Sequence, residues 1–265
     1  MKKWCASALL CAVLLLGPSA QAAGSVLVDG APLENNASAQ VRNNTTYVSL
    51  RTVAQALRPT ATVVWENGQA TVRDSTLSLT ARPGSIYIAA NDRAIYLPDG
   101  VLLEDGCTLV PVRALASALG AQVDWDADTG TVYITSGAAA FAAYDSNSLY
   151  WLSRIISAES QGESLLGKIA VGNVVLNRVA SAEFPDSIYG VIFDDRWGGQ
   201  FEPVRNGSIY QEPTEESVLA AKLVLEGASV AGNSLYFLSP SLTSNHWIMN
   251  NRPYVMTIGC HWFYA

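Results

Sequence analysis

The sequence predicts an α+β chain in two parts: a small duplicated strand and helix N-terminal domain, followed by a helix-rich α+β domain. Three observations lead to this prediction. A twelve-residue pattern occurs twice in the front half. Three segments with helical periodicity follow in the back half. Short β-branched and aromatic runs lie inside each repeat and near the C-terminus. Internal repeats and a change of hydrophobic period are strong indicators of such an organisation.

Residues 1–23 have the pattern of a secretory signal peptide. Lys2 and Lys3 form a charged start, residues 8–16 are apolar, and Ala20–Ala22 gives the small-x-small cleavage pattern. The apolar stretch is too short to span a bilayer, so we expect a secreted chain with no membrane span. Without both lysines the net charge changes from −7 to −9. An acidic surface argues against nucleic acid as a partner.

Residues 24–136 form the repeated domain. Thr46–Leu57 matches Thr108–Leu119 at an offset of 62 residues. Each copy predicts a strand, a short helix and two further strands, the first of which holds a tryptophan, Trp65 or Trp125. Because tryptophan is chiefly a large packing residue, we expect these two side chains to anchor the core, with sugar stacking as the alternative.

The predicted helix of each copy has an apolar stripe that would cover a small sheet. The stripe residues are Val53, Leu57, Leu115 and Leu119. Arg51 and Arg113 are expected to cap or brace the helices. The pattern resembles the copper amine oxidase N-terminal-like domain of secreted bacterial proteins, over about Val26 to Ile134. The resemblance implies a noncatalytic module. It implies no copper, and the front half has no histidine to bind one.

After a linker rich in small residues, placed at 137–147, the second domain covers 148–265. Its first helix is predicted over Asp145–Glu159, where Leu149, Leu152, Ile156 and Glu159 fall on one stripe at about 100° per residue. A carboxyl group in apolar surroundings has a raised pKa and can act as a general acid. The alternative is a solvated helix end, or a carboxylate paired with a nearby arginine.

Two more helices and two strands are predicted in this half. Residues 165–181 are apolar almost all round, which indicates a buried central helix. Thr214 would cap a helix over Glu215–Glu226, and strands are expected over 234–238 and 255–264. Asn173 and Asn177 share a face of the central helix and need hydrogen-bond partners. They would either brace the Glu159 loop or satisfy backbone groups.

A glycine- and aromatic-rich loop occupies residues 194–207. Gly198 and Gly199 allow the backbone to approach a ligand closely, and Gln200 offers both a donor and an acceptor. This half also has many aromatic rings that could stack on sugars or fill the core. These rings are Trp197, Phe201, Tyr210, Tyr236, Trp247 and Trp262.

An ordered series of motifs resembles the SleB-type cell-wall hydrolases, the spore cortex-lytic enzyme family, over about Leu149 to Tyr264. The motifs are Ile156–Glu163, Ala170–Val179, Phe184–Ile188, Gln200–Gly207, Trp247–Ile248, Arg252–Pro253 and Ile258–Phe263. The resemblance implies a lysozyme-like α+β catalytic domain that cleaves peptidoglycan glycan strands in the cell wall or spore cortex. Some members are lytic transglycosylases, and others are described as hydrolases. The repeat module replaces the family's usual small peptidoglycan-binding domain, which leaves the spore cortex open as the target.

Glu159 is the catalytic acid that this resemblance implies. We expect a monomeric enzyme without metal or cofactor, whose partner is the glycan strand. The residues expected to bind substrate are Gln200, Phe201, Asn177, Tyr236, Trp247, His261 and Glu163. A second catalytic carboxylate would come from Glu163, Asp194, Asp195 or Glu202, at the separations that glycosidases require. A mechanism with Glu159 alone is favoured, because in a lytic transglycosylase the 6-hydroxyl of the substrate replaces water.

Three other functions fit the sequence less well. A zinc amidase needs several metal ligands, but only His246 and His261 are present. A cysteine peptidase using Cys260 and His261 is disfavoured, because adjacent strand residues point to opposite faces. A noncatalytic wall-binding protein would suit the aromatic residues but leaves Glu159 unexplained. Cys107 and Cys260 could form an interdomain disulfide or stay as two buried thiols, and the absence of a bridge is favoured.

Overall fold

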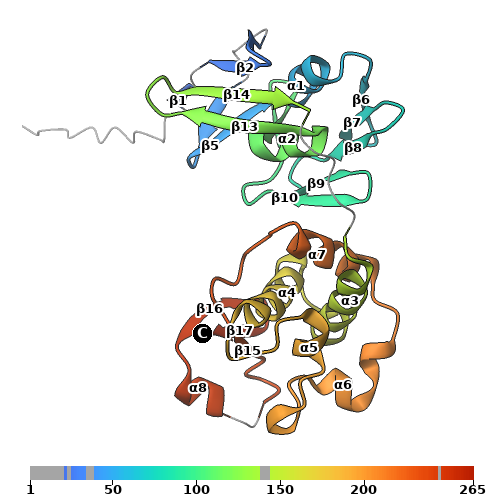
Figure 1. The fold of residues 1–265 in the computed structure, drawn as a ribbon, viewed down its shortest axis with the longest axis vertical. Coiled ribbons are helices and arrows are strands. Elements are labelled where there is room, and N and C mark those ends of the chain that lie inside the picture. Colours follow the sequence, from blue (N-terminus) through green and yellow to red (C-terminus); the bar gives the residue numbers. More distant parts are fainter. Residues whose placement is uncertain (1–20, 23–24, 34–38, 138–143, 244–245) are drawn as a thin grey trace, which may run out of the picture.

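The structure is a computed structural model that describes residues 21–22, 25–33, 39–137, 144–243 and 246–265. It has a strand-rich front half and a helical back half that ends in a small sheet (Figure 1). The α+β prediction is therefore confirmed. Most of the predicted signal peptide and of the predicted linker lies outside the described residues. None of the described helices is long and apolar enough to cross a membrane.

The described strands of the front half form three sheets. The first sheet has the order β1 (Gln21–Ala22), β4 (Gln40–Arg42), β5 (Thr45–Ser49), β12 (Cys107–Pro111) and β11 (Leu102–Glu104). The second has the order β10 (Arg93–Tyr96), β9 (Tyr87–Ala90), β8 (Ser78–Ala81), β7 (Gln69–Arg73) and β6 (Thr62–Glu66). The third has the order β13 (Ala121–Asp126), β14 (Thr131–Ser136), β2 (Val26–Val28) and β3 (Ala31–Pro32).

The predicted repeat is present as two copies of strand, helix, strand, strand. The first copy is β5, α1 (Leu50–Leu57), β6 and β7, and the second is β12, α2 (Val112–Leu119), β13 and β14. Ser49 caps α1 by accepting a hydrogen bond from the Thr52 amide. Gly120 ends α2 with a left-handed φ of 77°, which favours glycine.

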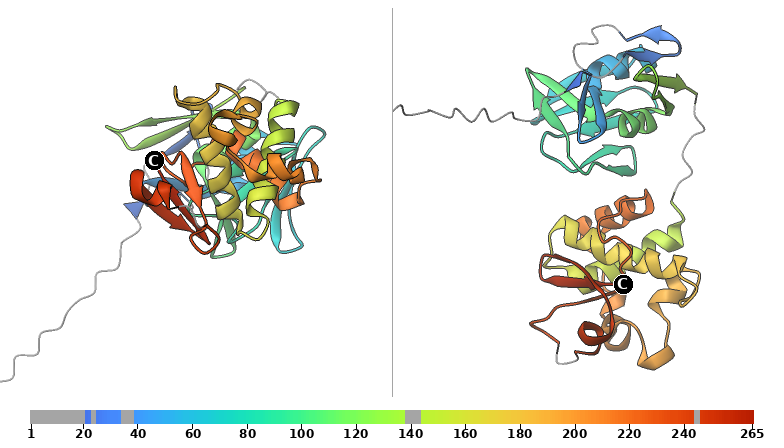
Figure 2. Two further views of the ribbon diagram at one scale, coloured as in Figure 1. Left: turned by 90° about the horizontal axis from the view of Figure 1, so that it is seen from below. Right: turned by 90° about the vertical axis from the view of Figure 1, so that its left-hand side faces the viewer.

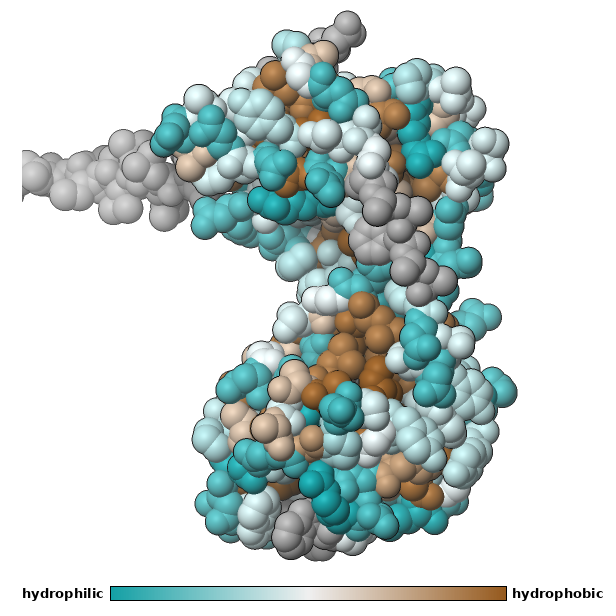
Figure 3. Space-filling view, in the orientation of Figure 1, coloured by the Kyte–Doolittle hydropathy of each residue, from teal (hydrophilic) through white to brown (hydrophobic). Residues whose placement is uncertain are grey.

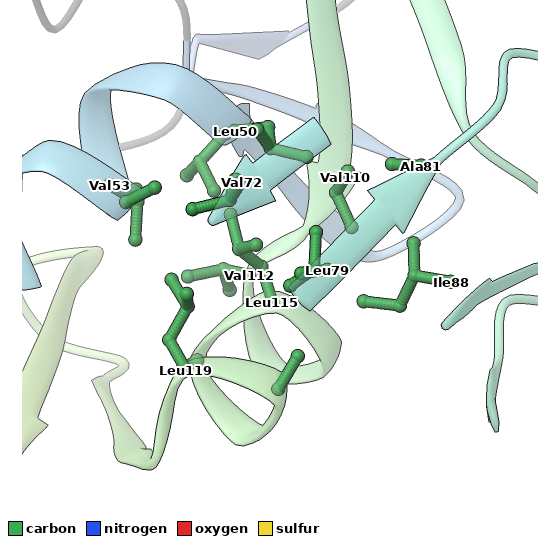
Figure 4. Close-up of a cluster of buried hydrophobic side chains, with 14 of the residues drawn as sticks. Leu50, Val53, Val72, Leu79, Ala81, Ile88, Val110, Val112, Leu115 and Leu119 are labelled. Atoms are coloured by element: carbon green, nitrogen blue, oxygen red, sulfur yellow. The ribbon is translucent and has the colours of Figure 1, made fainter. Parts of the chain in front are cut away.

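The two copies share one core rather than packing separately. Strands β5 and β12 pair antiparallel, with Val48 opposite Val110. Apolar side chains from both helices and from the second sheet meet in a single cluster (Figure 4). Its members include Leu50, Val53, Val72, Leu79, Ile88, Val110, Val112, Leu115 and Leu119. The prediction that both helix stripes cover a sheet is confirmed for the stripe residues Val53, Leu115 and Leu119.

The arginines brace the helices as expected, but the tryptophan prediction is wrong. Arg51 Nη1 donates to the Val63 carbonyl at 2.9 Å, and Arg113 Nη1 donates to the Val123 carbonyl at 3.5 Å. Each pair ties a helix to the strand that follows it. Trp65 and Trp125 lie on the outward face of those strands and are 50% and 57% exposed. They are surface residues, not core anchors.

The helices of the back half are the predicted ones plus several short ones. The long helices are α3 (Ser146–Ser160), α4 (Leu165–Ala180) and α7 (Glu215–Leu225). The short ones are α5 (Ile188–Ile192), η2 (Arg196–Gly198), α6 (Glu202–Asn206), η3 (Ser208–Tyr210) and α8 (Trp247–Asn251). Asp145 caps α3 and Thr214 caps α7, each through its side-chain oxygen.

Helix α4 is the buried centre of this half, as its apolar sequence predicted. Its middle glycine, Gly172, lies where a Cβ atom would come within 2.9 Å of side-chain atoms of Ile156 on α3 and Val224 on α7. The missing side chain therefore lets three helices pack closely. In the face shown in Figure 3, hydrophilic residues cover most of both halves, and the largest hydrophobic patch lies on this helical half, near the junction.

A three-stranded sheet completes the back half, in the order β15 (Tyr236–Leu238), β17 (His261–Tyr264) and β16 (Tyr254–Ile258). The single strand predicted over 255–264 is in fact a hairpin. Gly259, with a φ of 58°, and Cys260 form its turn. Cys260 and Cys107 form no disulfide in this structure, and both thiols are exposed rather than buried as expected.

The two halves touch through β10 and the end of α7 (Figure 2). Arg93 Nε lies 2.7 Å from Glu226 Oε1, and Arg93 Nη2 lies 2.8 Å from Oε2. The Tyr144 hydroxyl donates to the same carboxylate at 3.0 Å and accepts from the Ala94 amide at 3.2 Å. Bidentate charge-assisted pairs of this kind are among the strong hydrogen bonds of proteins. The contact therefore joins the halves beyond their covalent connection.

Candidate active site

Glu159 lies in the last turn of α3 and opens onto a cavity of about 810 Å³. The side chain is half-buried, and its helix neighbours Ile155 and Ile156 are fully buried. The cavity walls come from α3, α4, the loop around η2, α6, β15 and α8. The lining residues are Glu159, Arg178, Glu183, Phe184, Asp194, Arg196, Gly199, Gln200, Phe201, Glu202, Arg205, Tyr236, Phe237, Trp247, Ile248 and Arg252.

Burial controls the ionisation of Glu159. Loss of contact with water raises the pKa of its carboxyl group from 4.5 to about 7. The charge of Arg178 lowers this pKa, the charge of Glu202 raises it, and Arg205 lowers it again, each by less than burial. Within the described residues, Glu159 forms no hydrogen bond or ion pair through its carboxyl group. The group can therefore hold a proton at neutral pH and still release it.

Arg178, from α4, is a buried cation in the wall of the same cavity. Its Nε donates to the Leu235 carbonyl at 2.7 Å, while Nη1 is fully buried with no hydrogen-bond partner among the described residues. Aromatic rings surround the guanidinium, whose Cζ lies 4.9 Å from the centre of Phe184, 5.1 Å from Phe201 and 5.5 Å from Tyr236. Burial lowers the pKa of Arg178 to about 10, so it stays charged at neutral pH.

Two other carboxylates of the cavity are held by adjacent arginines. Asp194 accepts from Arg196 Nε at 2.8 Å and from Nη2 at 2.7 Å, and these bonds lower the pKa of its carboxyl group. Glu202 Oε2 accepts from Arg205 Nε at 3.0 Å and pairs with Nη2 as well. Both groups are therefore engaged in ion pairs, in contrast to Glu159.

The mouth of the cavity combines aromatic rings with cations. Arg252 Cζ lies 4.5 Å from the ring centre of Tyr236 and 5.6 Å from that of Trp247. Trp247 is 52% exposed. Rings with polar neighbours suit a polyhydroxylated ligand, because such a ligand has both apolar and hydrogen-bonding faces.

The structure brings five of the eight predicted site residues together. Glu159, Gln200, Phe201, Tyr236 and Trp247 all line the cavity. Gln200 Nε2 donates weakly to the Arg196 carbonyl at 3.4 Å. Phe201 is only 3% exposed. Its ring therefore forms part of the wall around Arg178 and offers little surface to a ligand.

Asn177, Glu163 and His261, which were also predicted to bind substrate, do not line this cavity. Asn177 Nδ2 donates to the carbonyls of Gly232 and Ser234, both at 2.9 Å. It satisfies backbone groups, as does Asn173, whose side chain binds the backbone of residues 228–231. Of the two interpretations of this amide pair, the structure selects backbone satisfaction over a brace for the Glu159 loop.

Glu163 and His261 support the hairpin of β16 and β17. The Glu163 carboxylate accepts from the Cys260 amide at 3.2 Å and lies 3.8 Å from His261 Nδ1. Burial lowers the pKa of His261, which packs edge-on against Phe237 with ring centres 5.2 Å apart. Both residues thus act in packing rather than on the cavity surface.

Sequence reasoning missed the cations of this site. The missed lining residues are Arg178, Arg196, Arg205 and Arg252. Arg178, Arg205 and Arg252 fall within the motif ranges Ala170–Val179, Gln200–Gly207 and Arg252–Pro253, so their place in an ordered motif was an available signal. Among the residues that the structure describes, no group of three or more His, Cys, Asp and Glu side chains could hold a metal ion.

Comparison with known proteins identifies both halves. Residues 162–264 match the family model described as Cell Wall Hydrolase, and residues 27–134 match the Copper amine oxidase N-terminal domain. Both resemblances that the sequence motifs predicted are thus confirmed over these residues.

Proteins similar to this chain include spore cortex-lytic enzymes. The spore cortex-lytic enzyme of Bacillus cereus is 38% identical over 120 residues, which cover 45% of each chain. That of Bacillus subtilis is 32% identical, over 45% of this chain and 38% of the relative. The chain thus spans less than half the length of these relatives. The solved catalytic domain of the germination-specific lytic transglycosylase SleB from Bacillus anthracis is 36% identical, with 48% of this chain covering all of that domain at a TM-score of 0.43.

Proposed function

We propose that this chain cleaves the glycan strands of peptidoglycan, with Glu159 as the general acid and then the general base. The observation that supports this most is the carboxyl group of Glu159. It has a pKa raised to about 7, has no ion-pair partner among the described residues, and opens onto a large aromatic-lined cavity. The cell wall hydrolase match over residues 162–264 supports the same substrate.

The proposed reaction needs no second carboxylate. Protonated Glu159 donates its proton to the glycosidic oxygen, and the bond between that oxygen and C1 breaks. The Glu159 carboxylate then takes the proton of the 6-hydroxyl group, whose oxygen bonds to C1 and closes a 1,6-anhydro ring. Atoms and charges balance without water. The arginine pairs of Asp194 and Glu202 support this route, because both carboxylates are already engaged in ion pairs.

Arg178 has a supporting role in this proposal. When Glu159 has given up its proton, a buried anion is left beside the cavity. The fixed cation of Arg178 favours that anion, and its aromatic surroundings and its bond to Leu235 hold it in place. A charge preorganised in a water-poor site stabilises such a state more than one in bulk water.

The test is the variant Glu159→Gln with purified peptidoglycan. Loss of the general acid is expected to slow clearing of a wall suspension by at least about 100-fold. Glu183→Gln is the matched control, because Glu183 lines the same cavity but is exposed. Full clearing by Glu159→Gln would contradict the role of Glu159. Mass spectrometry of the products separates anhydro ends, which we expect, from the reducing ends that hydrolysis leaves.

A noncatalytic wall-binding protein is the second candidate, favoured by the exposed aromatic residues of both halves. It predicts that the wild-type chain sediments with the wall without clearing it. The remaining parts of the proposal are the domain limits 24–136 and 148–265, a monomeric state, and action outside the cell on the wall or spore cortex. The names of the relatives support the last of these.

A further inference from the structure

The front module has a groove of its own. Its lining residues lie between positions 41 and 132, whereas those of the catalytic cavity lie between positions 159 and 252. The groove has a volume of about 480 Å³. It lies at the seam of the two repeats, between the hairpin of β4 and β5, which leads into the first copy, and α2, β13 and β14 of the second copy. The lining residues are Val41, Asn44, Thr45, Thr46, Pro111, Val112, Arg113, Val123, Trp125 and Val132.

Trp125 forms one wall of this groove and is 57% exposed. An indole with more than half of its surface in water forgoes much of the stabilisation that burial would give it. The neighbouring polar groups, on Asn44, Thr45 and Thr46, are uncharged and can donate or accept hydrogen bonds. A flat apolar face beside neutral polar groups matches a sugar ring with hydroxyl and N-acetyl substituents.

The charge of the groove is opposite to that of the chain. The whole sequence has a net charge of −7, yet the lining of this groove contains one arginine and no carboxylate. Arg113 uses Nη1 for a long hydrogen bond of 3.5 Å to the Val123 carbonyl and is otherwise exposed. An exposed guanidinium favours a ligand that carries carboxylate groups.

We propose that this groove is a second binding site for the wall polymer, namely an N-acetylated glycan strand bearing carboxylate side groups. Trp125 stacks on a sugar ring, and Arg113 pairs with a carboxylate. The identity of the polymer rests on the proposed function, whereas the site itself does not. The contact of Arg93 with Glu226 joins the groove-bearing module to the half that carries the catalytic cavity.

The duplication supplies matched controls for the test. Trp65 is 50% exposed at the corresponding position of the other repeat and does not line this groove. Arg51 makes the corresponding bond to Val63 and also lies outside the groove. Trp125→Ala and Arg113→Gln can therefore be compared with Trp65→Ala and Arg51→Gln, which remove the same groups from the same structural setting.

The experiment measures co-sedimentation of the full chain with purified peptidoglycan, with every variant built on Glu159→Gln so that the polymer stays intact. Trp125→Ala is expected to weaken binding about threefold to tenfold relative to Trp65→Ala, as expected for the loss of one stacking contact. Arg113→Gln should weaken binding to peptidoglycan, but not to oligomers of N-acetylglucosamine, which lack carboxylates. Thermal unfolding confirms that each variant is folded.

Equal binding by the Trp125 and Trp65 variants would overturn the proposal. If Arg113→Gln weakens binding equally to peptidoglycan and to N-acetylglucosamine oligomers, the proposed pairing of Arg113 with a carboxylate would be overturned. A second measurement separates this proposal from the catalytic one. With Glu159 intact, Trp125→Ala should slow clearing of whole walls yet cleave short soluble glycan fragments at the wild-type rate. If the parent chain clears nothing but the binding differences persist, the catalytic proposal fails and the groove stands.

Discussion

The pKa of Glu159 makes the stability of the folded protein depend on pH in a defined direction. The carboxyl group titrates near 4.5 in an unfolded chain and at about 7 in the folded one. Below pH 4.5 it is protonated in both states and changes nothing. Between pH 4.5 and 7 the folded state keeps a proton that the unfolded state has lost, so the free energy of unfolding falls as the pH rises. Above pH 7 the ionised, buried Glu159 carboxylate lowers the free energy of unfolding by its full amount.

The size of this penalty follows from the two pKa values. One pH unit corresponds to 1.36 kcal/mol, so ionised Glu159 lowers the free energy of unfolding by up to about 3 kcal/mol. This figure is an upper limit, because the side chain keeps some contact with water in the cavity. Glu159→Gln removes the penalty. The variant is therefore expected to match the wild type near pH 4 and to be about 2 to 3 kcal/mol more stable at pH 8.5.

Urea unfolding followed by circular dichroism at several pH values measures this difference. Glu183→Gln again serves as the control, because an exposed carboxyl at the same cavity should change stability by less than about 0.5 kcal/mol at any pH. A stability gain from Glu159→Gln that is the same at pH 4 and pH 8.5 would refute the raised pKa. The same result would remove the main physical argument for Glu159 as a general acid.

Two further predictions concern supporting contacts. Gly259→Ala should destabilise the back half by more than about 1 kcal/mol, because a Cβ atom there would overlap the Glu163 carboxylate and φ is +58°; an unchanged melting temperature would argue against this packing. Arg93→Gln and Glu226→Gln should show a coupling energy of about 1 to 3 kcal/mol in a double-mutant cycle, because they form a bidentate pair. Additive losses would mean that the two halves are not joined by this pair.

Local sequence signals predicted the three long helices of the back half well. The starts of α3 and α7 follow from Asp145 and Thr214, whose side chains cap the first turn wherever the rest of the chain lies. The repeat units were also predictable, because each contains its own strand, helix and turn residues. The strands β8 to β10 between the two copies were not predicted, because their pairing partners are set by the whole sheet rather than by local sequence.

Side-chain placement depends on tertiary contacts that the sequence does not display. Trp65 and Trp125 were expected in the core on account of their size, but strand alternation puts them on the outward face. Glu163 and His261 stand in the same motif series as Glu159. Motif membership cannot separate a residue that faces the cavity from one that holds a hairpin. The cavity itself assembles side chains from α3, α4, β15 and α8, which only the fold brings together.

The two steps of the proposed reaction have opposite requirements for the Glu159 carboxyl group, and its surroundings meet both. Donating a proton requires a carboxyl that is still protonated at neutral pH, which burial at the end of α3 provides. The negative end of the helix dipole also disfavours the ionised form. Accepting a proton afterwards requires that the anion be tolerated, and the charge of Arg178 lowers its energy. A pKa near 7 is the balance of these effects, and it is the value at which one group serves best as both acid and base. The buried arginine is therefore as much a part of the proposed single-carboxylate mechanism as the glutamate.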